Sequence, residues 1–116
     1  MPSSGVVGNA GNLCWGRVGS ADVACLQGRV HLYEGHSLDV ATFGVRLLAR
    51  LGCKAVLLTN AAGGVNLDFS PGDLMLITDH LNLTGKNPLI GPNDDAVGPR
   101  FPDMTRAYDP EITEAA

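Results

Sequence analysis

The chain has 116 residues, of which 45% are hydrophobic and 17% charged, and its formal net charge is −4. This length and composition are typical of one globular domain and argue against a disordered segment. The negative charge and the lack of a basic tract argue against nucleic acid or an anionic membrane as a partner, although one arginine can still hold a small anion. The apolar runs are too short to span a bilayer and the first residues lack the pattern of a secretion signal, so we expect a cytoplasmic protein.

Two strands are predicted near the N-terminus, after a loop over residues 1–10. The segments 12–18 and 21–33 are joined near Gly19 and Ser20, and their pattern is typical of a β-hairpin.

The chain has three cysteines, Cys14, Cys25 and Cys53, an odd number without the spacing of a metal site. Free cysteine is among the most buried residue types, so we interpret all three as reduced thiols of the core. A disulfide or a nucleophilic cysteine is the alternative, and nothing in the sequence supports either.

A helix is predicted over residues 37–52. Ser37 can cap its start, Asp39 suits the first turn, and Gly52 can end it. The apolar run 54–60 then predicts a buried parallel strand, and residues 71–82 predict another strand after a Pro-Gly turn. Strand, helix and strand in this order predict an α/β fold, with a mixed, partly parallel sheet flanked by helices.

The C-terminal part is rich in loop residues. Residues 83–110 contain five of the seven prolines and predict a long ordered loop, of the kind that often carries function. Asp109, Pro110 and Glu111 predict a helix start, and the chain stops within about two turns of it. We therefore interpret residues 1–116 as a single incomplete domain, a fragment of a longer fold.

The stretch "QGRVHLYEGH" contains a first candidate site. In an extended segment Arg29, His31 and Tyr33 would project from one face. Arg29 offers a planar fork for phosphate oxygens, and His31, about 6–7 Å further along a strand, is close enough to share one anion. Glu34 would point the other way, unless a bend at Gly35 returns it to orient an imidazole. The alternative is the solvated face of an edge strand.

The stretch "TNAAGGVN" contains a second candidate site, directly after the predicted buried strand. Ligands of open α/β sheets bind beyond the carboxyl ends of strands. Asn60 can make directed hydrogen bonds there, while Ala61, Ala62 and Gly63 let the backbone approach a ligand and offer N–H groups to an anion. The alternative is an ordinary tight turn, and the string is neither a GxGxxG motif nor a P-loop.

Phe101 is an aromatic ring in a polar, proline-rich loop. It either packs on its own domain as a loop anchor or inserts into a neighbouring subunit.

Taken together, the strings resemble the trimeric, low-molecular-mass purine nucleoside phosphorylases. The resemblance rests on "GRVHLYEGH", "TNAAGGVN", "PGDLMLITDHLNLTGKNPLIGPND", "GPRFPDM" and "AYD" in this order. It implies an α/β sandwich around a mixed sheet, and phosphorolysis of purine ribonucleosides or deoxyribonucleosides to the free base and a pentose 1-phosphate. It also implies that inorganic phosphate is the co-substrate and that no metal or organic cofactor takes part.

The resemblance also assigns roles to single residues. Arg29, His31 and the main-chain amide of Ala61 match the phosphate ligands, and Tyr33 matches the residue that meets the ribose. Glu34 matches an acidic neighbour that supports the histidine, so His31 and Glu34 are the expected catalytic residues. The nucleoside pocket is matched by Asn60, Ala62 and Gly63, and Phe101 matches the ring lent to an adjacent subunit.

The chain also departs from the family pattern. Members are more than twice as long, and their N-terminal glycine-rich loop and purine-binding later half have no counterpart in residues 1–116. Asn9 stands where most members have a histidine. We therefore expect little or no phosphorolysis by this chain alone, and a homo-oligomer, a trimer in the family, or a complementing chain as its partner. A non-catalytic interaction or regulatory fragment and a phosphate-binding module remain the alternatives.

Overall fold

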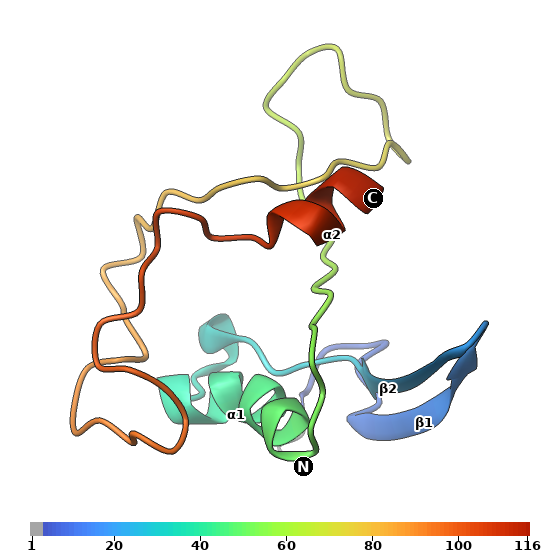
Figure 1. The fold of residues 1–116 in the computed structure, drawn as a ribbon. Helices are drawn as coiled ribbons and strands as arrows, with labels where there is room; N and C mark the ends of the chain where they lie inside the picture. The colour runs from blue at the N-terminus through green and yellow to red at the C-terminus, as the bar shows by residue number, and fades with distance from the viewer. Residues whose placement is uncertain (1–3) are drawn as a thin grey trace. The chain divides into compact units, whose positions relative to one another are not determined.

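A computed structural model describes residues 4–116, so the first three residues of the loop predicted over residues 1–10 lie outside it. The elements in chain order are β1 (Asn12–Val18), β2 (Ala21–Gln27), the 3₁₀ turn η1 (Leu32–Glu34), α1 (Leu38–Arg50) and α2 (Pro110–Ala115) (Figure 1). The chain divides into two units, Met1–Leu57 and Leu58–Ala116, and each is described by itself.

The predicted hairpin is confirmed. β1 and β2 pair in antiparallel fashion, with Asn12 opposite Gln27 and Val18 opposite Ala21. Gly19 supplies the left-handed backbone that the tight turn needs, at φ 58°. β2 ends at Gln27, earlier than the predicted end at residue 33, because Gly28 turns the backbone out of the ladder with φ 89°.

The cysteines differ from their interpretation as core thiols. All three are free, but Cys14 and Cys25 are exposed and Cys53 is half-buried. The reason is that the hairpin is two-stranded and both faces are largely uncovered, so apolar strand positions do not reach a core.

The predicted helix is confirmed as α1, and its ends are closed by local residues. Ser37 Oγ accepts a hydrogen bond from the Val40 N–H at 3.4 Å. At the other end the N–H of Gly52 donates to the Ala49 carbonyl and the N–H of Cys53 to the Leu48 carbonyl, at 3.0 and 3.1 Å. This pair of bonds is the Schellman motif, which requires a left-handed residue such as Gly52, at φ 89°.

The apolar contacts of the first unit lie between α1 and the segment that contains β2. Among residues 4–116, Val30 and Leu48 are the buried hydrophobic side chains. Gly44 faces Leu26 closely, since a Cβ at position 44 would lie 2.7 Å from Leu26 Cδ1. The absence of a side chain at Gly44 therefore lets α1 approach the end of β2.

The prediction of strands over residues 54–60 and 71–82 is wrong for the described chain. Residues 4–116 contain one two-stranded antiparallel sheet and no parallel pairing. The chain can be followed from α1 to α2 without a helix or strand (Figure 1). A strand forms only when its N–H and C=O groups find a partner ladder, and these segments have none. Their apolar side chains remain exposed, Leu57 at 81% and Leu81 at 88%.

The second unit is shaped by local hydrogen bonds. Asp109 caps α2 by accepting from the N–H groups of Glu111 and Ile112 at 2.9 and 3.1 Å, which confirms the predicted helix start. His80 and Tyr108 contact each other through Nε2 and the phenol oxygen, with ring centroids 5.5 Å apart. Within residues 4–116, no helix has the length and apolar character needed to cross a bilayer.

Candidate functional site

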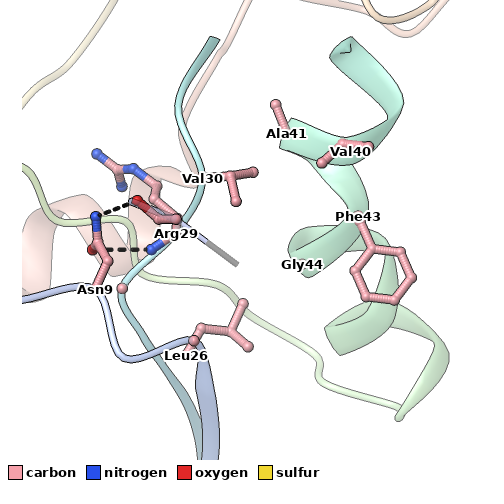
Figure 2. Close-up of a pocket in the computed structure, with 11 residues that line it drawn as sticks. Asn9, Leu26, Arg29, Val30, Val40, Ala41, Phe43 and Gly44 are labelled. Atoms are coloured by element: carbon pink, nitrogen blue, oxygen red, sulfur yellow. Dashed lines mark hydrogen bonds between the residues drawn. The ribbon is translucent and has the colours of Figure 1, made fainter. Parts of the chain in front are cut away.

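The first candidate segment begins with a close contact between Gly28 and Asn9. A Cβ at position 28 would lie 2.4 Å from Asn9 Oδ1 and 2.5 Å from Asn9 Cα, closer than real atoms approach. Asn9 Oδ1 accepts the main-chain N–H of Arg29 at 3.3 Å (Figure 2). The bare backbone at Gly28 thus lets Asn9 fix the point where the chain leaves β2.

Arg29 and Val30 alternate as the sequence predicts. Val30 is only 8% exposed and points toward α1, where Val40 and Ala41 face it, while the Arg29 side chain points away from the helix (Figure 2). The backbone is still extended at His31, with φ −119° and ψ 148°. Burial of Val30 therefore orients Arg29 to the open side.

Beyond His31 the predicted straight row is wrong, because the chain folds into η1 at Leu32–Glu34. The turn closes at Gly35, whose φ of 87° favours glycine. It brings the ring of Tyr33 onto the ring of His31, with centroids 4.8 Å apart and an interplanar angle of 12°. The imidazole and the phenol therefore form a stacked pair, and Tyr33 remains 76% exposed.

Glu34 ties the turn to the N-terminal loop. Its Oε2 accepts the main-chain N–H of His31 at 2.7 Å, and its Oε1 accepts the N–H of Gly5 and the hydroxyl of Ser4 at 2.8 and 2.9 Å. Partial desolvation raises the pKa of Glu34, but these three hydrogen bonds and the positive charge of His36 together bring it below its ordinary value. The carboxylate thus contacts the backbone of His31.

The segment 29–34 presents groups that can bind an oxyanion and a hydroxyl. A guanidinium binds phosphate oxygens through parallel N–H donors, and an imidazole two residues away can add another. A phenol stacked on that imidazole can bond a hydroxyl.

A cavity of about 40 Å³ lies between this segment and α1, lined by residues that include Leu26, Val30 and Phe43 (Figure 2). It has room for a few water molecules and is far smaller than the sites that bind small molecules. It is therefore a packing gap between the hairpin end and the helix.

The second candidate segment lies in the second unit. Asn60, Ala61, Ala62 and Gly63 are exposed and belong to no helix or strand. Next to them, a Cβ at Gly64 would lie 3.1 Å from Phe69 Cδ2, so Gly64 allows the phenyl ring to approach the backbone. Arg29 and His31 belong to the first unit, and convergence of the two segments on one anion stays a prediction.

Phe101 does not serve as the loop anchor that one interpretation predicted, because its ring is 87% exposed. Its neighbour Arg100 holds the loop, donating from Nη1 to the carbonyls of Leu89 and Gly91 at 2.9 and 2.8 Å. The guanidinium carbon of Arg100 also lies 5.9 Å from the centroid of the Phe101 ring. Insertion of Phe101 into a neighbouring subunit stays a prediction.

Four residues support the candidate segments or the Phe101 loop, and the sequence analysis did not identify this role: Ser4, Asn9, Gly28 and Arg100. A glycine directly after a strand signals a turn, so Gly28 had a usable signal. Ser4, Asn9 and Arg100 act through hydrogen bonds to residues 5 to 30 positions away, and no local pattern marks these contacts. Within residues 4–116 there is no group of three or more metal-ligating side chains.

Comparison with known proteins places the chain in a family. A sequence model described as the phosphorylase superfamily matches residues 3–116, so the chain belongs to the phosphorylase superfamily. It is similar to purine nucleoside phosphorylase 1 of Geobacillus stearothermophilus, with 54% identity, and to purine nucleoside phosphorylase 1 of Bacillus subtilis strain 168, with 52%. The purine nucleoside phosphorylase of Mus musculus is 48% identical over an alignment of 119 positions.

These similarities cover all of this chain but only part of each relative. The alignments span 100% of the chain and 42%, 43% and 41% of the three relatives, respectively. The chain therefore spans about two-fifths of the length of the curated relatives it matches.

Proposed function

We propose that this chain carries the phosphate- and ribose-facing part of a purine nucleoside phosphorylase, a pentosyltransferase of purine salvage in the cytoplasm. The observation that carries the proposal is the phosphorylase-superfamily match over residues 3–116, which includes both candidate segments. The names of the three relatives support the reaction class.

In the proposed reaction, inorganic phosphate attacks the anomeric carbon of the nucleoside while the bond to the purine nitrogen breaks. Arg29, His31 and the main-chain N–H of Ala61 hold the phosphate as it approaches. A positioned nucleophile and charge complementary to the transition state are the main sources of rate enhancement in such a displacement. We propose no metal or organic cofactor for this step.

The remaining residues position the sugar and base. Tyr33, stacked on His31, meets the ribose, and Glu34 keeps the His31 turn closed through its main-chain bond. Asn60, Ala62 and Gly63 line the nucleoside pocket, and Phe101 covers the sugar of an adjacent subunit in a trimer. The exposure of the Phe101 ring supports this last role.

The chain alone is proposed to be inactive, and to require the rest of the family fold from further sequence or from a complementing chain. Arg29, His31 and Ala61 can hold phosphate, but they cannot by themselves stabilise the departing purine. With the rest of the fold in place, the segments 54–60 and 71–82 would pair into the partly parallel sheet. The exposed apolar side chains of these segments, such as Leu57 and Leu81, support this pairing.

The first test is phosphate binding by the 116-residue chain, followed through the imidazole resonances of His31 at millimolar phosphate. Arg29→Ala should weaken the binding by about tenfold, which corresponds to one lost charge-assisted contact. Arg46→Ala removes a cation from α1 and should leave the affinity unchanged.

The second test is turnover of inosine and guanosine by the chain alone. Release of free base at a rate that depends on Arg29 would contradict the proposed inactivity. Phosphate binding without purine binding would favour a simple phosphate-binding module. A stable assembly that does not respond to phosphate would favour an interaction or regulatory fragment.

A further inference from the structure

The exposed cysteines of the hairpin form a pair. Cys14 on β1 lies directly opposite Cys25 on β2 in the antiparallel register. Directly opposite residues project from the same face of a sheet. Both cysteines also line one shallow groove of about 210 Å³, together with Trp15, Val18 and Val23. The two thiols are therefore neighbours on a surface open to solutes.

The geometry points to a modification site: Cys14 and Cys25 form a reversible cross-strand disulfide when the chain meets a low-molecular-mass disulfide. Opposite residues of an antiparallel pair have Cα atoms about 4.5 or 5.5 Å apart, and both values lie inside the range that disulfides span. Both thiols are free and exposed, so the reagent can reach them. Cys53 lies after α1, outside the ladder, and has no such partner.

The bridge should be labile. Opposite residues have Cβ atoms about 4.5–5.5 Å apart, whereas bridged cysteines need about 3.5–4.5 Å, so the strands must approach each other by up to about 1 Å. The hairpin is the whole of the described sheet, and no third strand opposes this small shift within residues 4–116. A bond formed with strain is reduced more readily, which is typical of regulatory disulfides.

The reaction balances as two thiol–disulfide exchanges. One cysteine thiolate attacks a sulfur of oxidised glutathione and releases one glutathione thiol. The second cysteine thiolate then attacks the mixed disulfide, forms the Cys14–Cys25 bond and releases the second glutathione thiol. The protein loses two electrons and two protons, and the small disulfide gains both.

Trypsin provides a direct assay, because cleavage after Arg17, Arg29, Arg50 and Lys54 places the cysteines in three different peptides. These peptides are 1–17 with Cys14, 18–29 with Cys25, and 51–54 with Cys53. After exposure of the chain to oxidised glutathione and a thiol-blocking reagent, peptides 1–17 and 18–29 should appear as one species, lighter than their sum by two hydrogen atoms. The two peptides should separate again after treatment with reduced glutathione.

Matched variants identify the pair. Cys53→Ser should leave the bridge unchanged, and Cys25→Ser should abolish it and leave a mixed disulfide on Cys14. In the unsubstituted chain that mixed disulfide should be less than about a tenth of the product, because the second exchange is intramolecular. A link to peptide 51–54, a predominance of intermolecular dimers, or mixed disulfides as the main product would overturn the proposal.

A second measurement does not depend on oxidation. Phenylarsine oxide binds two neighbouring thiols together. One equivalent should bind to the reduced Cys53→Ser chain, and none to a chain that carries Cys14→Ser as well. Equal binding by both chains would also overturn the pairing, and circular dichroism of each variant verifies that the fold is kept.

Discussion

The main-chain N–H of His31 and the carboxylate of Glu34 are joined at 2.7 Å, across the turn that begins at Leu32. A glutamate at this position of a turn can reach back to the first N–H that lacks a partner. The same carboxylate accepts the hydroxyl of Ser4 and the N–H of Gly5. One side chain thus connects the proposed phosphate segment with the N-terminal loop.

This contact predicts a pH dependence of local structure. Because the pKa of Glu34 is lowered in the folded chain, the stabilisation is present above its ordinary value of 4.5 and is lost as the pH falls through the folded pKa. The amide resonances of His31 and Gly5 should therefore titrate together, with a midpoint below 4.5. Glu34→Gln should abolish this titration, while Glu114→Gln in α2 should leave it intact. Separate midpoints at His31 and Gly5 would contradict a shared carboxylate.

Because Gly28 lies so close to Asn9, adding one methyl group at position 28 should lower the unfolding free energy strongly. Gly28→Ala places a Cβ against the backbone and side chain of Asn9 at a residue with φ 89°. The left-handed backbone alone costs about 1–2 kcal/mol in an L-residue, and the clash adds to this cost. Chemical denaturation should show a loss of at least about 2 kcal/mol in unfolding free energy. Gly16→Ala, where a Cβ meets nothing within 4 Å, is the matched control and should change little.

Substitutions at the two ends of α1 should lower the unfolding free energy by different amounts. Ser37→Ala removes the N-cap acceptor and should reduce the unfolding free energy by about 0.5–1 kcal/mol, a modest value because the bond is 3.4 Å long. Gly52→Ala should cost about 1 kcal/mol or more, because it forces a left-handed backbone on alanine. Far-UV circular dichroism during denaturation measures both. Ser20→Ala in the hairpin turn serves as control, and an equal loss there would argue against a capping effect.

The two hydrogen bonds donated by Arg100 should restrain the motion of the proline-rich loop. Arg100→Met keeps the length of the side chain but removes the donors to Leu89 and Gly91, which should cost about 1 kcal/mol locally. Backbone ¹⁵N relaxation should then show faster motion at residues 89–91. Arg106→Met in the same unit should leave these residues unchanged. If both variants behave alike, Arg100 does not hold the loop.

Sequence patterns predicted those elements whose signals are local. The turn at Gly19, the cap at Ser37, the stop at Gly52 and the start at Asp109 each depend on residues within one turn of the element. The strand over 54–60 depends on a neighbouring ladder that lies outside the segment itself. The apolar composition of residues 54–60 indicates side chains that favour burial, but it does not tell whether a neighbouring strand is present.

The candidate site could also be predicted only where its structure depends on local sequence. Alternation correctly placed Val30 toward the protein and Arg29 toward the open side. Extension of that pattern to Tyr33 was wrong, because Gly35 and the carboxylate of Glu34 stabilise a turn that competes with the strand. The sequence predicts that a bend at Gly35 would return Glu34 to orient an imidazole. The bend is present, but the Glu34 carboxylate bonds the main-chain N–H of His31.

The closed ends of α1 also bear on the order in which the chain acquires structure. Ser37, Gly52 and Cys53 satisfy the helix termini without help from distant sequence. Helices form within about a microsecond, far faster than long-range strand pairing. During synthesis, α1 can therefore form while the apolar residues after it are still emerging, and it offers their side chains an apolar surface against which to pack.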